Sequence, residues 1–421
     1  MSKKNIKNQS RITRPESNQP LNLYPLFLWR SEPLNLERVR KEKSMDFALS
    51  GESKMMVKAA RDFALKEIEP AAEKIEKNDT LPDDLLEKFA KARMLGMMVP
   101  REYGGIGTSA LNVILVAEEL AKTASAAVFM MALNNSIAET IYYWGSEEIR
   151  RKFIQPLCDG SSYASMAFTE PATGSDPTAI TMTAKKDGDS YRLNGTKRFI
   201  TNGHKNGHGV FYAKDETGKV TAYMVDKGSE GYTWSKPWSL MGLAGQGLVD
   251  VFLKDVKVPH ENILGEPGKG FHILLRWIAG ERIQQMAFMT GMGQECLNQS
   301  LKFAKERMVR GKPMTAMQGF QWMFAEMHAS IEACRWWTYR VACKQDAGDD
   351  FQVDSAALKL FVVPAIQEVA RKALQIHGSY GYCKDYKIER LYRTIAHAGI
   401  TASSTELQKT IVGSALARSQ E

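Results

Sequence analysis

The chain has 421 residues, 44% of them hydrophobic and 25% charged, and it carries a formal net charge of +8. This length and composition are typical of a globular protein with two or three packed units, and without an uninterrupted apolar run of about 18 residues we expect no membrane span. The five cysteines are scattered and form no C-x-x-C pair, which argues for a reducing compartment and against a disulfide framework or a structural zinc site.

The first 44 residues differ from the rest of the chain. They hold ten lysines and arginines against four glutamates, a surplus of six charges, so the other 377 residues carry only about +2. A nucleic-acid-binding surface needs basic residues arranged on a folded domain, and this leader is rich in Asn, Pro and Ser instead. We interpret residues 1–44 as a disordered extension or a translated upstream region, with a plausible start at Met45, and we expect them to be dispensable.

The period of the hydrophobic residues changes twice along the chain. Residues 52–155 repeat apolar positions three and four apart, which predicts helices. Residues 161–260 approach a period of two between Gly- and Asp-bearing turns, which predicts a compact antiparallel unit. Helical spacing then returns over four segments typical of a bundle, at 271–309, about 315–347, 353–378 and from Thr405. We therefore predict an α+β fold with an N-terminal helical domain at 45–160, a middle β domain at 161–265 and a C-terminal four-helix bundle at 266–421.

Three short motifs carry residue types that suit a ligand. AFTEPATGSD, residues 167–176, offers hydroxyls and a shaped turn that can hydrogen-bond a flat heteroaromatic edge or a phosphate. KRFITNG, residues 197–203, places Phe199 and Thr201 on one face of a predicted strand. In QIHGSYGY, residues 375–382, a glycine allows close approach of the backbone. Taken singly, an ordinary turn or strand accounts for the first two equally well.

A fourth stretch, GITASSTELQ at residues 399–408, begins a predicted helix. Ser403 and Glu406 have the spacing of a capping box, in which each side chain bonds the other's backbone N–H. A loop that enters a helix N-terminus suits an anionic or carbonyl ligand. The residues ahead of this cap, however, have only small or hydroxyl side chains, so the loop itself contains no acid or base.

In this order and spacing, the first three motifs resemble the acyl-CoA dehydrogenase family. VPREYGGIG (99–107), LNNS (133–136) and GEPGKGF (265–271) extend the resemblance over nearly the whole chain from about Met45 to Leu416. It implies a three-domain flavoprotein, usually a homotetramer, that binds FAD at a subunit boundary. Such enzymes oxidise the α,β bond of an acyl-CoA thioester and usually pass electrons to an electron-transfer flavoprotein. We expect a cytoplasmic protein, or a mitochondrial-matrix protein if the source is eukaryotic.

The resemblance also implies which residues contact the ligands. Those implied for FAD are Met166, Phe168, Thr169, Ser175, Phe199, Ile200, Thr201, Arg307, Gln318, Gln375, Ile376, Gly378, Ser404 and Glu406. Those implied for the substrate are Ser175, Arg282, Ala402 and Ser403. Arg307 matches an arginine that reaches the FAD pyrophosphate of a neighbouring subunit. The chain departs from the family pattern at Arg310, Met317 and Ser379, where a phenylalanine, a histidine and a glycine are usual.

The catalytic base is the most distinctive difference. Many family members carry a glutamate in a loop that reads YEGTSE, where this chain reads TASSTE and has Ala402 at the glutamate's position. A subset, including isovaleryl-CoA-type and long-chain-type enzymes, carries the base on the first helix of the bundle, where this chain has Glu281. Glu281 shares a helical stripe with Leu274, Ile278 and Gln285, and apolar surroundings would raise its pKa toward neutrality. The backbone N–H of Ala402 can still donate to the thioester carbonyl.

Several alternatives stay open at this stage. Glu281 could be a partly solvated residue paired with Arg282. The flavin could serve an enoyl-CoA reductase running the reverse reaction, or the chain could be a catalytically silent homologue. A flavin monooxygenase of this fold is less consistent with TEPATGSD. Bulky residues at Trp277, Trp322 and Met308 indicate a short, branched or cyclic acyl group.

Overall fold

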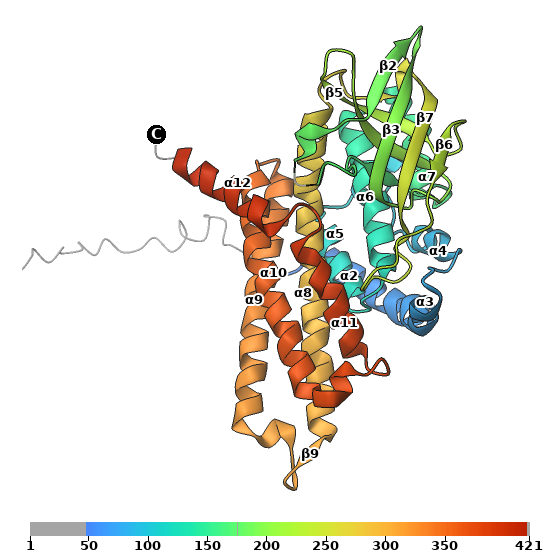
Figure 1. The fold of residues 1–421 in the computed structure, drawn as a ribbon. Helices are drawn as coiled ribbons and strands as arrows, with labels where there is room; N and C mark the ends of the chain where they lie inside the picture. Colours follow the sequence, from blue (N-terminus) through green and yellow to red (C-terminus); the bar gives the residue numbers. More distant parts are fainter. Residues whose placement is uncertain (1–47, 175, 419–421) are drawn as a thin grey trace, which may run out of the picture. The chain divides into compact units, whose positions relative to one another are not determined.

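The computed structural model describes residues 48–174 and 176–418 (Figure 1). Contacts divide the chain into two units, Met1–Leu49 and Ser50–Glu421. The predicted leader therefore lies outside the described residues, and so does Ser175, which we expect to contact both FAD and substrate. The following description concerns the unit that begins at Ser50.

Helices form the part of this unit that precedes the sheet. They are α2 (Gly51–Phe63), α3 (Ala72–Asn78), α4 (Leu85–Lys91), α5 (Ala110–Ala121), α6 (Ala126–Trp144) and α7 (Glu147–Cys158), with short turns η1 (Ala64–Ile68), η2 (Glu69–Ala71) and η3 (Arg101–Tyr103). A serine caps the N-terminus of α2, α5, α6 and α7, at Ser50, Ser109, Ser125 and Ser146. Each hydroxyl accepts a bond from a backbone N–H in the first turn, which fixes where these helices begin.

An eight-stranded sheet follows in the order β6-β7-β3-β2-β4-β5-β8, with β1 paired to β4. Its strands are β1 (Ser165–Ala167), β2 (Thr183–Asp187), β3 (Ser190–Thr201), β4 (His208–Lys214), β5 (Val220–Asp226), β6 (Tyr232–Trp234), β7 (Leu248–Pro259) and β8 (Ile263–Leu264), with turns η4 (Pro177–Ala179) and η5 (His260–Asn262). The prediction of an antiparallel unit is right for most pairs but wrong for two, because β1 and β2 both pair with β4 in parallel. A parallel pair joins distant segments, so no turn between neighbouring strands signals it in the sequence.

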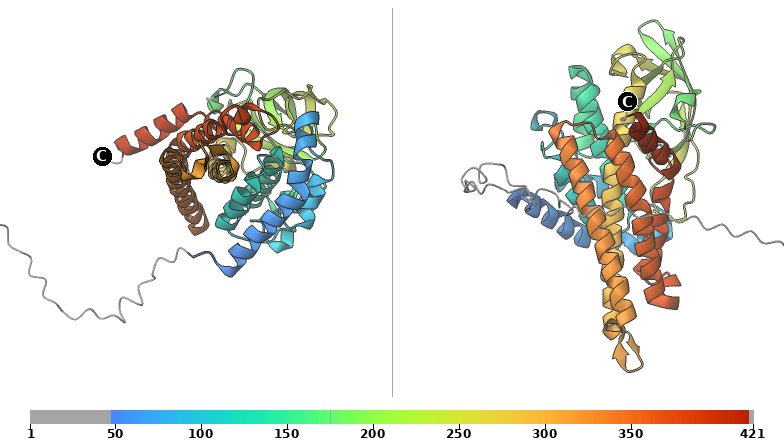
Figure 2. Two further views of the ribbon diagram at one scale, coloured as in Figure 1. Left: turned by 90° about the horizontal axis from the view of Figure 1, so that it is seen from below. Right: turned by 90° about the vertical axis from the view of Figure 1, so that its left-hand side faces the viewer.

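The C-terminal part is again helical. It contains α8 (Gly270–Glu306), α9 (Gln318–Ala347), α10 (Gln352–His377), α11 (Lys387–Ala396) and α12 (Thr405–Arg418), with the hairpin β9 (Met308–Val309) and β10 (Lys312–Pro313) and the turns η6 (Met314–Ala316), η7 (Gly378–Tyr382) and η8 (His397–Gly399). The views agree that α8, α9 and α10 lie side by side (Figures 1 and 2). Helical N- and C-terminal parts around a β domain confirm the predicted fold class. None of the helices within residues 48–174 and 176–418 is both long and apolar enough to cross a membrane.

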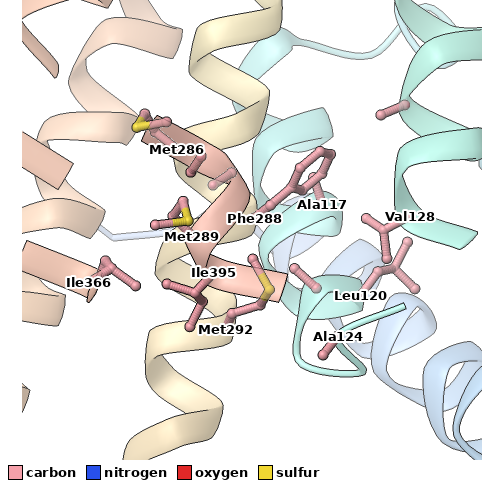
Figure 3. Packing of buried hydrophobic residues seen from close by; sticks show 14 of the residues in the cluster. Ala117, Leu120, Ala124, Val128, Met286, Phe288, Met289, Met292, Ile366 and Ile395 are labelled. Atoms are coloured by element: carbon pink, nitrogen blue, oxygen red, sulfur yellow. The ribbon is translucent and has the colours of Figure 1, made fainter. Parts of the chain in front are cut away.

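The long helix α8 belongs to two hydrophobic cores. Its first turns place Leu274 and Ile278 in the core of the sheet. Further along, Met286 and Phe288 belong to the helical core, which they share with residues of α5, α6, α10 and α11 (Figure 3). Glu281 therefore lies on α8 where one core gives way to the other.

Candidate active site

The Glu281 carboxyl group is enclosed but not neutralised by a neighbour. Leu274, Ile278 and Gln285, which share its predicted stripe, are all buried. Among the residues that the structure describes, Oε2 of Glu281 has no hydrogen-bond partner. Burial raises the pKa of Glu281 from 4.5 to about 7, while the charge of Lys359 acts in the opposite direction. A carboxyl group with this pKa can take or return a proton near neutral pH.

The loop before α12 contacts Arg282, the residue after Glu281 on α8, and is held by a buried lysine. Nζ of Lys359, on α10, donates to the carbonyl oxygen of Ser403 at 2.6 Å and also to that of Thr401. Between them the backbone is left-handed, with φ of 49° at Ala402 and 72° at Ser403. The pKa of Lys359 is lowered to about 7, first by burial and then by the nearby charge of Arg282, with the charge of Glu281 acting in the opposite direction. The lysine thus fixes a loop conformation that non-glycine residues seldom adopt.

Two side chains of α8 hold the same loop. Arg282, which is buried, directs Nε to the carbonyl oxygen of Ala402 at 3.5 Å, and Gln285 donates to the hydroxyl of Thr401. Burial lowers the pKa of Arg282 to about 10, so it remains a cation at neutral pH. Because Arg282 points to Ala402, it forms no salt bridge with Glu281 within residues 176–418. In the described parts of the chain, the Ala402 N–H has no acceptor.

The cap of α12 differs from the predicted capping box. Ser404, rather than Ser403, accepts the bond from the backbone N–H of Leu407, at 3.3 Å. The left-handed conformation of Ser403 displaces the cap by one residue, and Glu406 is exposed and hydrogen-bonded to its neighbour Thr405. The sequence spacing alone could not show this shift, because Ser403 and Ser404 are both good capping residues.

The predicted flavin loop is tied to β3 by a buried ion pair. Lys197 lies 2.7 Å from Glu170, and both side chains are almost fully buried. Lys197 also donates to the carbonyl oxygen of Phe168, and Arg198 N–H donates to that of Thr169 at 2.8 Å. The segment after β1 therefore runs directly beside the end of β3. Sequence reasoning did not single out the Lys197–Glu170 pair, although both residues stand within the motifs it identified.

A β-bulge gives the end of β3 an unusual surface. The register of β3 against β7 shifts between Lys197 and Ile200, and Phe199 has a φ of 57°. Phe199 is consequently 49% exposed, with its ring 5.5 Å from that of Trp238. Phe199 stands within the bulge, where the simple alternation of side chains along a strand is interrupted. Ile200 is buried in the core, so only its backbone can face a ligand.

Trp277 links this region to Glu281. Its ring meets that of Phe168 edge-on at a centroid distance of 6.2 Å, and its Nε1–H donates to Ser136 on α6 at 3.1 Å. Trp277 and Glu281 are one helical turn apart and line the same pocket. The exposed ring of Phe199 can stack on a flat heteroaromatic group such as a flavin. The hydroxyls of Thr169 and Thr201 can form hydrogen bonds with the edge of such a group. Met166, at the start of this region, is buried in β1.

The remaining residues implied for FAD lie at the other end of α8. Arg307 follows its last residue and stacks on the ring of Tyr380 at 5.9 Å, beside the exposed Gln375 and Gly378. Gln318 begins α9 and is exposed, whereas Ile376 is buried. At 1.5 Å per residue, the 26 positions from Glu281 to Arg307 correspond to about 39 Å along the helix. Within one chain, the residues implied for FAD therefore form two groups that lie far apart.

Lys359 is the main site residue that sequence reasoning missed. The signal was present, because Lys359 is spaced three and four positions from Ala356, Val362 and Val363, which are all buried. A lysine on the apolar stripe of a helix needs a local acceptor, which here is the loop before α12.

Comparison with known proteins agrees with this architecture. Family models match residues 50–161 as an acyl-CoA dehydrogenase N-terminal domain, 165–256 as the middle domain and 268–417 as the C-terminal domain. The chain is 34% identical to a 3-(aryl)acrylate reductase of Clostridium sporogenes, over 85% of this chain and 97% of the relative. It is 35% identical to an acryloyl-CoA reductase (NADH) of Anaerotignum propionicum, over 90% and 98% of the two chains.

Solved structures show the same likeness. Butyryl-CoA dehydrogenase from Megasphaera elsdenii matches with a TM-score of 0.86 and 33% identity, over 89% of this chain and all of that one. A structure described as the electron transferring flavoprotein of Acidaminococcus fermentans matches with a TM-score of 0.87, 33% identity and the same coverage. Fold and site define a flavin-dependent oxidoreductase. The chain belongs to the acyl-CoA dehydrogenase family, and its cofactor is FAD.

Proposed function

We propose that the protein oxidises the α,β bond of an acyl-CoA thioester and that Glu281 is its catalytic base. The observation that carries this proposal is the buried, unpartnered carboxyl oxygen of Glu281, whose pKa is raised to about 7 by burial. Its position one turn from Trp277 and next to Arg282, which contacts the loop of Ala402, supports the same role. A glutamate kept only for stability would be better placed in an ion pair or in water.

In the proposed reaction, Glu281 takes the α-proton while the β-hydrogen leaves with its electron pair and the α,β double bond forms. FAD, when bound, supplies the hydride acceptor. The Ala402 N–H donates to the thioester oxygen, which stabilises the negative charge that develops as the α-proton leaves. Lys359 and Arg282 hold the carbonyl groups of the loop, so this N–H is oriented before substrate binds. Thr169, Phe199 and Thr201 would hold the flavin ring.

Trp277 is the bulky residue that we propose for the acyl site. Trp277 lines the pocket of Glu281. Met308 and Trp322 are exposed residues of β9 and of the start of α9, beyond the end of α8. We retain a short, branched or cyclic acyl group as the proposed substrate, with Trp277 as the residue that limits its length.

The reverse reaction is a second candidate. The two relatives described above are reductases, and a carboxyl group with a pKa of about 7 can hold the proton that a reductase returns to the α-carbon. A catalytically silent homologue is a weaker candidate, because the buried, unpartnered Glu281 would then have no role.

We infer that the active site is completed by other subunits, as in a homotetramer. The span of about 39 Å between Glu281 and Arg307 supports this, because Glu281 is proposed to act on the substrate beside the flavin ring while Arg307 is implied to bind FAD, and one chain holds the two far apart. We further propose an electron-transfer flavoprotein as the electron acceptor, on the strength of the similar structure described under that name. The five cysteines are free, which is consistent with the expected cytoplasmic location.

The decisive experiment is anaerobic reduction of the bound flavin by a panel of acyl-CoA thioesters. Glu281→Gln is expected to bind FAD and acyl-CoA but to reduce the flavin about 10²- to 10⁴-fold more slowly, which is the usual contribution of a positioned general base. Ala402→Glu in that background is expected to restore part of the rate, whereas the control Glu406→Gln should not change it. Flavin reduction by Glu281→Gln at the wild-type rate would exclude Glu281 as the base. Mixing dithionite-reduced enzyme with enoyl-CoA thioesters tests the reverse direction.

A further inference from the structure

Three consecutive carbonyl groups at the end of β3, those of residues 201–203, each accept a hydrogen bond from a buried side chain. The donors are, in order, Ser165, Lys227 and Tyr232, at distances of 2.8, 2.9 and 2.9 Å. Ser165 belongs to β1, Lys227 follows the last residue of β5, and Tyr232 begins β6. Side chains from three parts of the sheet therefore hold one short turn. The proposed mechanism has no role for Lys227.

The backbone of this region adopts a conformation that needs such support. Phe199 and Asn202 are both left-handed, with φ of 57° and 58°, and non-glycine residues seldom adopt this conformation. It persists where surrounding groups determine it, as the donors to residues 201–203 do here. Thr201, which lies between the two left-handed residues, is half-buried. The direction of its hydroxyl group therefore depends on how firmly the turn is held.

Lys227 differs from the other two donors because it reaches a second segment. Its Nζ also donates to the carbonyl oxygen of Tyr163 at 2.8 Å, just before β1. Burial lowers the pKa of Lys227 to about 7, while the charge of the exposed Asp226 acts in the opposite direction. Burying an ammonium group costs more than burying a hydroxyl group, so a lysine is an expensive choice for one carbonyl. Its advantage is that a single group can hold both segments together.

We propose that Lys227 is a positioning residue that, with Ser165 and Tyr232, fixes the two segments that hold the flavin ring relative to each other. Tyr163 leads into β1 and the segment of Thr169, and Asn202 follows Thr201 directly. The proposal rests on the proposed function, in which the side chains of Thr169 and Thr201 hold the flavin ring. A site whose groups are already ordered loses less entropy on binding, so it retains its ligand longer.

The test uses the FAD-loaded protein with Lys227 changed to methionine, which keeps the chain length but removes the donor. We expect FAD release to be about tenfold faster or more, because two carbonyl groups lose their donor. Amide hydrogen exchange of residues 199–203 should become faster as well. The midpoint potential of the bound flavin should fall, since hydrogen-bond donors favour the more electron-rich reduced ring and Lys227→Met misaligns them.

Two comparisons separate a role at the ring from a general loss of binding. Arg307→Ala should also speed FAD release, but Arg307 is implied to contact the pyrophosphate, so this variant should keep the wild-type potential. Lys185→Met, which changes an exposed lysine of β2, should behave as the wild type in all three measurements. Tyr232→Phe removes a single donor, so it should speed FAD release about threefold and lower the potential in the same direction.

Each outcome decides between the proposals. Faster FAD release by Lys227→Met with the wild-type potential, or unchanged exchange of residues 199–203, would overturn the positioning role and leave Lys227 as a stabiliser of the sheet. Should Lys227→Met fail to fold, Tyr232→Phe decides, and wild-type release and potential in that variant would overturn the proposal. Failure of every acyl-CoA to reduce the wild-type flavin would instead refute the proposed function, while release, exchange and potential would still judge the role of Lys227.

Discussion

Replacing Glu281 with glutamine should change how the stability of the protein depends on pH. In the folded protein the pKa of Glu281 is about 7, against 4.5 for an exposed glutamate. The folded state therefore holds a proton that the unfolded state has lost between these two values. The contribution of Glu281 to stability falls as pH rises through this window, and above pH 7 the full penalty is present. Glutamine does not titrate, so the variant lacks this loss.

The size of the effect follows from the pKa difference. A shift of about 2.5 units corresponds to about 3 kcal/mol in the free energy of unfolding. With an unfolding entropy of roughly 2.1 cal/mol/K per residue over about 370 residues, that free energy corresponds to ~4 °C in Tm. The fixed cost of burying an amide in place of a carboxyl group cancels, because the comparison is between pH values and not between proteins at one pH.

Differential scanning of the FAD-saturated protein between pH 5 and pH 8.5 measures this effect. The Tm of Glu281→Gln minus that of the wild type should increase by ~4 °C across the range. Lys359 is present in both proteins, so the difference reports Glu281 together with its coupling to Lys359. Glu216→Gln, which changes an exposed carboxyl group, should follow the wild type at every pH. Parallel curves for the wild type and Glu281→Gln would refute the assignment of a buried, protonated carboxyl group.

Two further predictions concern groups that support the site. Lys359→Met should lower Tm, because two carbonyl groups lose their donor at about 1–3 kcal/mol each. The same variant should move the pH midpoint of flavin reduction upward, since the charge of Lys359 lowers the pKa of Glu281; a downward shift would contradict the coupling. Arg307→Ala should speed FAD release about tenfold or more, by loss of a charged hydrogen bond, measured from flavin fluorescence. The matched control Lys305→Ala, an exposed residue of α8 two positions before Arg307, should release FAD at the wild-type rate.

The sequence predicted the fold well because its hydrophobic period is clear. The first bundle helix was expected at 271–309 and is found at Gly270–Glu306, and the change to a period of two marks the sheet. Parallel pairing of β1 with β4 could not be predicted, since it depends on contacts between segments that are far apart in the chain. Residue spacing also cannot reveal the bulge that exposes Phe199, because bulges arise from the register between two strands.

The candidate site could be predicted where one element decides the geometry. The stripe that buries Glu281 follows from helical spacing alone. Lys359 was missed although it lies on an apolar stripe, because a charged residue on a helix usually faces water and only tertiary packing shows which acceptors it reaches. The shift of the α12 cap to Ser404 has the same origin, because the bonds from Lys359 set the conformation of the preceding loop.

The placement of the proposed base on α8 affects how the protein can change by mutation. A loop-borne base loses conformational entropy each time the loop orders around substrate, at about 1–2 kcal/mol per residue. Glu281 lies within an intact helix between two cores, so its position is already set when the chain folds. The loop from Thr401 to Ser403 contributes backbone groups to the site, and its carbonyls are held by side chains from α8 and α10. The Thr401 hydroxyl accepts a bond from Gln285, so variation is open at Ala402 instead, with proline the clear exception, and new acyl specificities can arise there without disturbing the proton acceptor.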